Sequence, residues 1–572
     1  MKVLSWVKTV GIPFAIRHWQ WLIYALLITG IFLVNSLHES YPDEFDNILG
    51  GHYILAGRLP YVGFFTHHGP VAYFVAALVE IFSGQSFVRF RIVYAIFLLA
   101  LTFGGYWFLR RRFGGKVAFY PILIFTIGIT ATYFWAHMLL ADSLSGFLLL
   151  PPFLLLLLST IYKRTLSLGD LAFITLGTFT SLFSSLTYLY LIVILYAFTL
   201  FSYIRTRKDF NPKKDLKKPL IVLALPFIAF ALYLVVTRGV GAYIQQNIIF
   251  NERYYIYNYP RPEGSGYINP VRFAILIAAE YYGATTGLLI NAKDFNLTYP
   301  FNSALAIADI GLIIVVLLGR RYSLAAFLLL VYIYANGRSN PLTSKETDYQ
   351  SAVYIMFSLG TVGFLLPYLY KLLNEPLELA KKILYGFLFL VLGLYAFFSF
   401  LFLFRRFEEK VIDKYMGRAP LIYDRPQLAP IMNKLVSDND YMWIGPFEFE
   451  ELFYAKGKLP SKFHILIPGI GKSSQVQEAM IADFTKHKPK VIMFDRAFFI
   501  LGSSPETFGQ FFLKFLADNY VTLYDYRPNG IRYVSIQPIT PRIDLETKLY
   551  IDKDRFNEVL DRLLQEHLVK PQ

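Results

Sequence analysis

Three carboxylates near the start of the chain are close enough together to do acid–base chemistry. Asp43, Glu44 and Asp46 lie within one short segment, Tyr41-Pro-Asp-Glu-Phe-Asp46. Neighbouring acids repel each other's charge, which raises the pKa of one of them toward the range of a general base. We expect one of the three, with Asp43 favoured, to take a proton from a hydroxyl group. The spacing also fits Asp43 as a helix N-cap with acidic residues in the first turn, which would hold a carboxylate rigidly.

The elements that position these carboxylates are predicted to be membrane helices. The 572 residues are 55% hydrophobic and 17% charged, whereas a soluble domain carries about 25% charged residues. Long uninterrupted apolar blocks are typical of a polytopic membrane protein. The chain has no cysteine, which excludes disulfides, thiolate catalysis and cysteine-ligated metals. The net charge of +15 is spread in short clusters between apolar blocks, as in membrane proteins, and does not indicate nucleic-acid binding.

About eleven apolar segments are long enough to be transmembrane helices. They lie near residues 19–37, 88–109, 117–136, 142–162, 166–183, 186–204, 219–237, 303–319, 322–336, 350–370 and 383–404. With eleven crossings, every basic cluster between the spans falls on one side, which predicts a cytoplasmic N-terminus and an extracytoplasmic C-terminus. We expect no cleavable signal peptide, because the first apolar block is long enough to span the membrane.

Two further apolar segments, 70–83 and 271–290, are not counted as crossings, because an additional crossing would place basic clusters on the other side of the membrane. The first is too short to cross, and the second contains Arg272, Glu280 and a Tyr-Tyr-Gly break. We expect both to be interfacial or re-entrant helices on the outer face.

The chain changes character near residue 405. Strand-like runs at 441–445, 463–467, 491–495, 521–526 and 533–536 alternate with helical stretches near 447–456, 473–486 and 505–518. Alternating strands and helices predict a soluble α/β domain. The expected organisation is a transmembrane catalytic domain at 1–404 and an extracytoplasmic domain at 405–572.

Several short motifs on the predicted outer face resemble those of the GT-C superfamily, in particular bacterial glycosyltransferases related to protein mannosyltransferases and to the aminoarabinose transferase of lipid A. The motifs are the acidic cluster after the first span, Gly57-Arg-Leu-Pro-Tyr61, His68-Gly-Pro70, Ser83-Gly-Gln-Ser-Phe-Val-Arg89, Asp142 and Ser344-Lys-Glu-Thr-Asp-Tyr349. Where aminoarabinose transferases have Lys-Pro-Pro, this chain has His68-Gly-Pro70, which leaves the phosphate contact at that position open.

The resemblance implies a GT-C-like fold and an enzyme that transfers a sugar, with inversion, from a polyprenyl phosphate to an acceptor outside the membrane. The base would come from the first outer loop. In the Ser344–Tyr349 segment, the resemblance places Lys345 on the lipid phosphate, with Tyr349 nearby.

Cations on the predicted outer side are candidates for the donor phosphate. Charge at membrane depth is costly and tends to be functional, and Arg suits bidentate phosphate contact. Arg89 and Arg91 begin the second span from outside, and Lys345 lies in an outer loop. Some of these side chains can instead reach toward lipid head groups.

Three histidines, His67, His68 and His137, are predicted near the same surface. Together with the carboxylates they are candidate ligands of a divalent cation such as Mg or Mn, for which Asp43, His68 and His137 are the best donors. The alternative is hydrogen bonding of the histidines to phosphate or sugar.

The sequence therefore favours a glycosyltransferase of the bacterial plasma (inner) membrane. Its partners would be a polyprenyl-phosphate sugar, a lipid, glycan or protein acceptor, and membrane lipid. Two other readings stay open. A transporter or flippase for lipid-linked sugars is less favoured, because no internal repeat is evident and charges within the spans are few. The other alternative is a relative that binds lipid-linked sugar without transferring it, which only an assay can distinguish from an active transferase.

Overall fold

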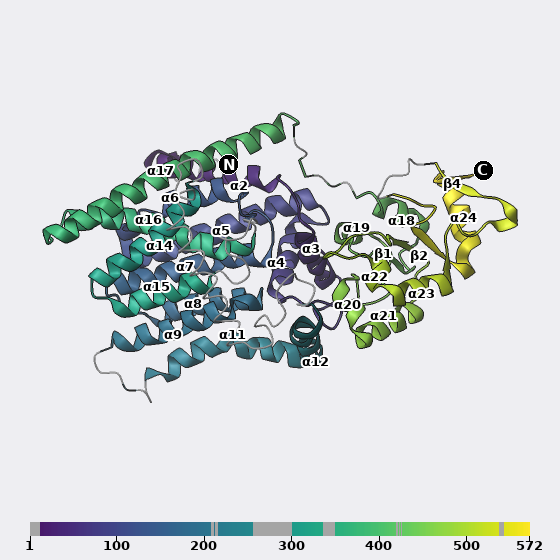
Figure 1. Ribbon diagram of the computed structural model, residues 1–572, viewed down its shortest axis with the longest axis horizontal. Coiled ribbons are helices and arrows are strands. Elements are labelled where there is room, and N and C mark those ends of the chain that lie inside the picture. The colour runs from purple at the N-terminus through teal and green to yellow at the C-terminus, as the bar shows by residue number, and fades with distance from the viewer. Residues whose placement is uncertain are drawn as a thin grey trace. The chain divides into compact units, whose positions relative to one another are not determined.

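The computed structural model describes residues 12–207, 211, 215–255, 300–335, 349–418, 421–422, 424, 426–536 and 543–572 (Figure 1). The chain forms two compact units, each built from separate stretches. Unit 1 combines Met1–Ser40, Phe87–Phe227 and Ala274–Ile422. Unit 2 combines Tyr41–Ser86, Ile228–Phe273 and Tyr423–Gln572. The predicted first outer loop thus belongs to the same compact unit as the C-terminal region, and the predicted boundary at 404/405 falls inside a helix, α17.

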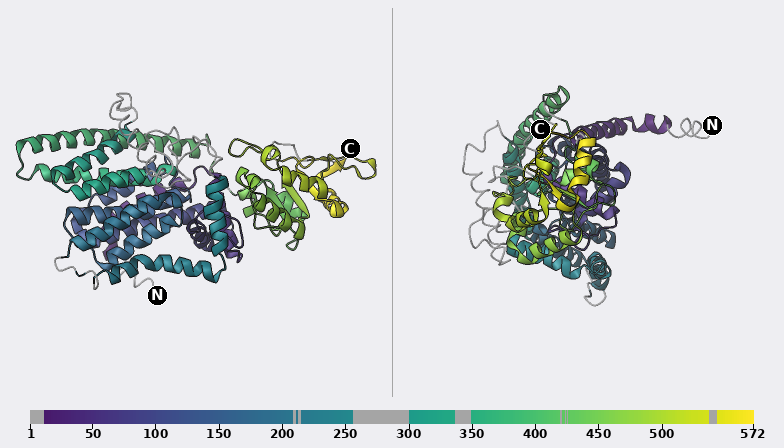
Figure 2. Two further views of the ribbon diagram at one scale, coloured as in Figure 1. Left: turned by 60° about the horizontal axis from the view of Figure 1, so that its bottom comes forward. Right: turned by 90° about the vertical axis from the view of Figure 1, so that its right-hand side faces the viewer.

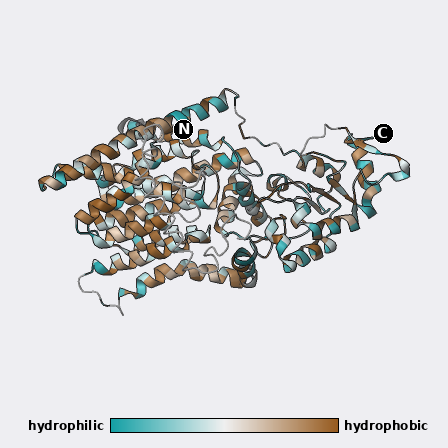
Figure 3. Ribbon diagram, viewed as in Figure 1, coloured by the Kyte–Doolittle hydropathy of each residue, from teal (hydrophilic) through white to brown (hydrophobic). Residues whose placement is uncertain are grey.

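Unit 1 is a bundle of apolar helices (Figures 2 and 3). They are α2 (Ile12–Ser36), α5 (Phe87–Phe113), α6 (Tyr120–Thr130), α7 (Ala141–Ile161), α8 (Leu168–Leu182), α9 (Leu189–Arg205), α11 (Lys217–Val236, which continues into unit 2), α14 (Phe301–Leu318), α15 (Tyr322–Tyr334), α16 (Ala352–Leu373) and α17 (Leu379–Tyr415). Each predicted span coincides with one of these helices.

Eight of the helices are long and apolar enough to cross a membrane, namely α2, α5, α7, α9, α11, α14, α16 and α17. The chain is therefore a polytopic membrane protein. The other three, α6, α8 and α15, are apolar but shorter, so the count of eleven crossings stays a prediction. The segment at 71–83 also forms a short apolar helix, α4 (Val71–Ser83). The second predicted interfacial segment, 271–290, lies outside the described residues.

Two consecutive prolines of α7 pack closely against the helices beside it. A Cβ on Gly105 of α5 would lie 2.7 Å from the ring of Pro151. A Cβ on Gly177 of α8 would lie 2.8 Å from the ring of Pro152. Glycines in the facing helices therefore make room for the proline rings, as small residues do where membrane helices approach closely. Most of α7 is buried in consequence.

Unit 2 carries the strands, together with short helices. Its helical elements are α3 (Pro42–Leu55), α4, α12 (Val240–Tyr243), the π-helical turns η4 (Ile244–Ile249) and η5 (Asn251–Tyr255), α18 (Ala429–Leu435), α19 (Phe449–Phe453), α20 (Pro468–Lys472), α21 (Ser474–Lys486), α22 (Pro505–Phe508), α23 (Gln510–Asn519) and α24 (Phe556–Gln565). A two-stranded antiparallel sheet pairs β4 (Tyr533–Ser535) with β6 (Val569–Pro571).

The main sheet has four strands in the order β1-β2-β5-β3. They are β1 (Met442–Gly445), β2 (Val491–Phe494), β5 (Leu549–Asp552) and β3 (Tyr520–Val521). β1 and β2 are parallel, while β5 is antiparallel to both β2 and β3. Trp443 of the edge strand β1 is buried, with Phe484, Phe494 and Phe512 around its ring at centroid distances of 5.2 to 5.9 Å.

The strands predicted at 441–445 and 491–495 are confirmed as β1 and β2. The strand predicted at 463–467 is wrong, because this stretch is extended without forming a ladder, although Leu466 N–H donates to the Pro446 carbonyl. The strand predicted at 521–526 is mostly a turn. These corrections leave a helical membrane unit and a smaller sheet-containing unit.

Candidate functional site

The three carboxylates lie on the first turns of α3 in unit 2. The helix begins at Pro42 with Tyr41 as its N-cap, so Asp43 is not the N-cap but lies inside the first turn with Glu44. Proline suits the first helical position because its missing N–H would be unpaired there in any case. Acidic side chains in the first turn are stabilised by the helix dipole. Glu44 is fully buried, whereas Asp43 is partly exposed.

A Gly-Gly pair brings α3 close to α4. A Cβ on Gly50 would lie 2.2 Å from the ring of Tyr73, and a Cβ on Gly51 would lie 2.6 Å from the backbone of Ala77. The helices can approach this closely only because these two positions lack side chains. This packing delivers the Tyr73 hydroxyl to the carboxylate end of α3.

Both carboxylate oxygens of Asp46 accept hydrogen bonds. Tyr73 Oη donates to Oδ2 at 2.9 Å, and His464 Nε2 lies 3.2 Å from Oδ1. Because the Tyr73 proton is committed to Asp46, the Thr66 hydroxyl donates to Tyr73 Oη at 2.6 Å. Thr66 Oγ1 in turn accepts the backbone N–H of His68 at 3.0 Å. A chain of hydrogen bonds thus links the segment 64–70, which carries His67 and His68 and is called the histidine loop below, to Asp46.

This network sets the protonation state of Asp46. Burial raises the pKa of the Asp46 carboxyl, but the hydrogen bond and charge of His464, the charge of His68 and the Tyr73 hydroxyl outweigh burial and lower that pKa below its ordinary value. A carboxylate with both oxygens engaged and a low pKa is a weak proton acceptor. Asp46 therefore fits a positioning role better than that of a base. The base assignment to Asp43 stays a prediction.

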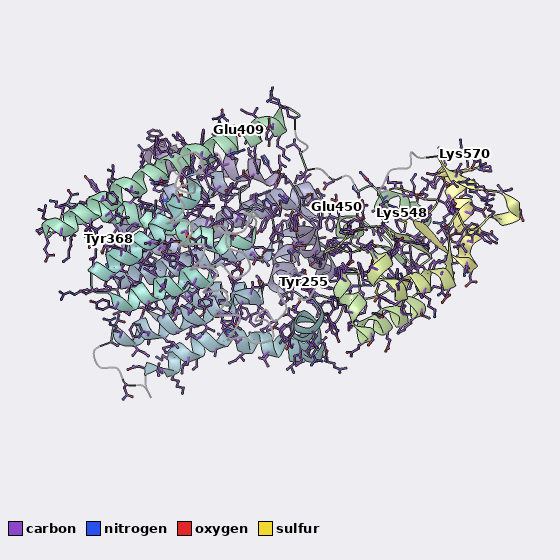
Figure 4. The ribbon with its side chains drawn as sticks, in the orientation of Figure 1. Tyr255, Tyr368, Glu409, Glu450, Lys548 and Lys570 are labelled. Atoms are coloured by element: carbon purple, nitrogen blue, oxygen red, sulfur yellow. The ribbon has the colours of Figure 1, made fainter. Side chains whose placement is uncertain are left out.

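The histidine loop is held by its backbone. The Asn251 amide donates to the His67 carbonyl at 2.7 Å, and the Tyr61 hydroxyl donates to the His68 carbonyl at 2.8 Å. The His67 ring lies 3.9 Å from that of His68 and 4.1 Å from that of Tyr255, which is labelled in Figure 4. The two adjacent histidines therefore sit against an aromatic side chain, in a loop whose backbone is fixed.

Gln246 of the π-helical turn η4 also bonds this loop. Its side-chain oxygen accepts the Thr66 N–H at 3.1 Å, and its amide donates to the Tyr61 carbonyl at 2.7 Å. Within unit 2, three stretches far apart in sequence thus meet around the loop: residues 41–86, the turns η4 and η5, and the region that carries His464.

A second polar cluster lies in unit 1. Arg91 is buried, and its guanidinium donates to the carbonyls of Ser36, His38 and Glu39 at 2.6 to 3.3 Å. These carbonyls follow or end α2, where a cation is favoured by the helix dipole. Arg91 thus fixes the chain as it leaves α2, and this structural role occupies two of its three nitrogens. Arg89, two residues earlier, is exposed.

Two histidines accompany Arg91. His38 and His137 are 1% and 5% exposed, and no described residue forms a hydrogen bond of good geometry with their ring nitrogens. Burial, reinforced by the nearby positive charges of Lys414, Lys410 and Arg91, lowers the pKa of His38 to about 4.

Burial also lowers the pKa of His137 well below its ordinary value, together with the charges of Arg91, His38 and Lys410, against a small opposing effect of the Ala131 backbone. Buried neutral imidazoles among cations are suited to receive an anion.

The other predicted residues are distributed as follows. Asp142 is buried in the first turn of α7 in unit 1. Lys345 lies outside the described residues. Tyr349 opens the 3-10 turn η7 (Tyr349–Ser351), and its side chain is outside the described part. Within the described residues no group of three or more His, Asp or Glu side chains is arranged to hold a metal ion.

Sequence reasoning missed Tyr73 and His464 in the cluster of unit 2, and the Lys410–Lys414 pair in the separate cluster of unit 1. His464 is the single ionisable residue in the apolar run 463–467, which is a signal for a buried, partnered side chain. Lys410 and Lys414 recur four residues apart on α17, beyond the end of the last predicted span. No protein-family model matches this chain, and a comparison with curated proteins finds no match either.

Proposed function

We propose that this protein is a membrane glycosyltransferase that moves a sugar from a polyprenyl phosphate to an acceptor hydroxyl on the outer face of the membrane. It would act with inversion, in the manner of the GT-C superfamily that its motifs resemble. The proposal includes eleven crossings, a cytoplasmic N-terminus, an extracytoplasmic unit 2 and a bacterial plasma membrane. The observation that carries it is the α3 acidic segment, whose geometry is fixed by Tyr73 and His464.

Fixation matters because a general base must be held within hydrogen-bonding distance of the hydroxyl that it activates. In the proposed reaction, the acceptor oxygen attacks the anomeric carbon while the bond from that carbon to the phosphate oxygen breaks. The hydroxyl proton passes to the Asp43 carboxylate, and polyprenyl phosphate leaves as the anion. Asp46, locked by two donors, would hold the turn that presents Asp43.

Unit 1 supplies two features that fit the lipid donor. The first is the cationic cluster of Arg91, Lys410 and Lys414 with His38 and His137, which suits a phosphate leaving group. The second is an apolar groove of about 520 Å³ lined by α6, α14, α16 and α17. Because these helices belong to the membrane bundle, a lipid chain is the natural occupant of that groove. Together they support a substrate with an anionic head and a long apolar tail.

The test is transfer of radiolabelled sugar from a panel of polyprenyl-phosphate sugars, with membranes containing wild type, Asp43→Asn or Asp518→Asn. Asp518 is an exposed acid of unit 2 and serves as the charge-matched control. Loss of a general base is expected to slow transfer about 10²- to 10⁴-fold, with the control unchanged. Equal transfer by Asp43→Asn and wild type would remove Asp43 as the base. No donor consumption by wild type would reject the enzyme and favour the transport or binding reading.

A further inference from the structure

A pocket of about 250 Å³ lies at the C-terminal end of α7, whereas His137 of the cluster around Arg91 shortly precedes the N-terminal end of the same helix. It is formed where α7 and α9 end and where the chain turns from α14 into α15. In the predicted topology, this is the cytoplasmic side. Three basic clusters that are separate in the sequence thus meet at one place.

Five cations line the pocket, and none of the described residues that line it is acidic. They are Lys163, Arg164, Arg205, Arg320 and Arg321. None of them forms an ion pair with a described carboxylate, although unit 1 does pair a cation elsewhere, where Arg112 lies 2.8 Å from Asp170. Five positive charges that converge with no described carboxylate beside them repel one another, so the arrangement favours an anion between them.

Polar groups in the wall are positioned to donate to such an anion. Arg205 is oriented by donating to Ser323 Oγ at 2.9 Å, and Arg321 by donating to the Ile161 carbonyl at 2.9 Å. Ser159 is 3% exposed, and its hydroxyl has no hydrogen-bond partner among the described residues. A buried hydroxyl without a partner costs free energy, which a ligand oxygen at this position would offset.

Helix capping accounts for only one of these cations, Arg321, whose guanidinium donates to the carbonyl of Ile161, the last residue of α7. Other carbonyls in the last turns of α7 and α14 are bonded by backbone, with Arg164 N–H donating to the Ser159 carbonyl and Arg321 N–H to the Val316 carbonyl. Lys163 and Arg320 occupy the turns that follow, at φ of 52° and 55°. Glycine is the usual residue in this left-handed conformation. Two basic side chains are thus present where the backbone would favour glycine.

We propose that this pocket binds the phosphate of an anionic phospholipid head group, a site that goes beyond the proposed glycosyl transfer. The pocket is smaller than the roughly 300 to 1,000 Å³ of sites for larger small molecules, and so suits a head group. Its wall also includes Phe201, which is 44% exposed on the side of α9, so that an apolar chain attached to the phosphate has a surface to follow. Basic pockets between membrane helices on the cytoplasmic side suit anionic head groups.

The test is native mass spectrometry of the purified full chain with titrated phosphatidylglycerol, phosphatidylcholine or inorganic phosphate. The test variant is Arg164→Gln/Arg320→Gln, because neither side chain bonds to a described residue. The control is Arg111→Gln/Lys382→Gln, which removes two charges from the same predicted side outside the pocket. Ser159→Ala tests the site without changing charge and serves if the double variant misfolds.

Wild type should retain phosphatidylglycerol in preference to phosphatidylcholine. Each removed pocket cation should weaken binding about fivefold, so the double variant should bind about 25-fold more weakly, and Ser159→Ala several-fold. The control should match wild type. Equal weakening by the control would show diffuse surface charge and overturn the proposal, as would unchanged binding by both pocket variants. Displacement of the lipid by millimolar inorganic phosphate would identify free phosphate as the ligand and overturn the lipid assignment.

Discussion

Removing one oxygen from Tyr73 should uncouple α4 from the acidic turn of α3. Tyr73 is fully buried, and its hydroxyl both donates to Asp46 and accepts from Thr66. A hydrogen bond to a charged acceptor contributes about 1.5–3 kcal/mol. Tyr73→Phe leaves the ring that packs on Gly50 in place, so we expect unit 2 to lose about 2 kcal/mol of unfolding free energy, with little change in packing.

A double-mutant cycle with Asp46→Ala isolates the pair from other effects. The coupling free energy should be about 1–2 kcal/mol at neutral pH. The sign of its pH dependence follows from the lowered pKa of Asp46. The contribution of the ionised Asp46 carboxylate to stability is present above the ordinary carboxyl pKa. It is lost as pH falls below about 4 and then through the folded-state pKa of Asp46. The coupling should therefore shrink in that acidic range.

The chain offers a local reporter for this measurement. Trp443 is the one tryptophan of unit 2 and is buried in the main sheet. With the other five tryptophans replaced by phenylalanine, its fluorescence follows denaturant unfolding of unit 2 in detergent. Tyr53→Phe is the matched control, because this side chain is buried and its hydroxyl bonds to no described residue. A coupling below about 0.5 kcal/mol at neutral pH would refute the inference that Tyr73 holds Asp46.

Three further predictions concern packing, a buried cation and pH. Gly51→Ala should lower the unfolding free energy of unit 2 by about 1–3 kcal/mol, because the added methyl group overpacks against α4. Gly241→Ala has open space at its Cβ and should not lower it. Denaturant unfolding followed by Trp443 fluorescence compares the two variants. Arg91→Gln should destabilise the purified protein by about 2–4 kcal/mol in denaturant unfolding by releasing three carbonyls. Arg111→Gln, at an exposed position, should change stability by less than about 0.5 kcal/mol. His38, whose folded pKa is about 4, should contribute stability fully above pH 6.5 and lose it progressively down to pH 4. The loss amounts to at most about 3 kcal/mol, and His38→Asn should flatten that part of the stability–pH profile.

The membrane helices were predictable because their signal is local. Most of the apolar blocks are long enough to require a helix in lipid, where backbone groups must be bonded within the segment. The end of the last helix was placed too early, since α17 continues to Tyr415 through a charged stretch. Hydropathy detects the apolar part of a helix but does not show whether the helix continues into a polar segment.

The sheet and the network around Asp46 depend on partners distant in sequence. β5 pairs with β2 and β3 across long intervals, and its sequence, Leu549–Asp552, carries little alternation. Asp46 was recognised as a candidate from its neighbours, but its partner His464 lies 418 positions away. Local spacing therefore predicts which residues could do chemistry, without indicating which of them are immobilised by the fold.

The polar groups inside the membrane unit bear on the choice between transfer and transport. Asp309, halfway along α14, is buried and accepts the hydroxyl of Ser358 at 2.7 Å, and Tyr332 bonds Thr361 at 2.6 Å. These are short-range contacts between neighbouring helices, of the kind that holds membrane bundles together. A transport path would call for ionisable groups succeeding one another across the bilayer. In the described part of unit 1 the cations instead gather at the helix ends, where a phosphate-bearing lipid would present its head group, which supports interfacial chemistry over passage.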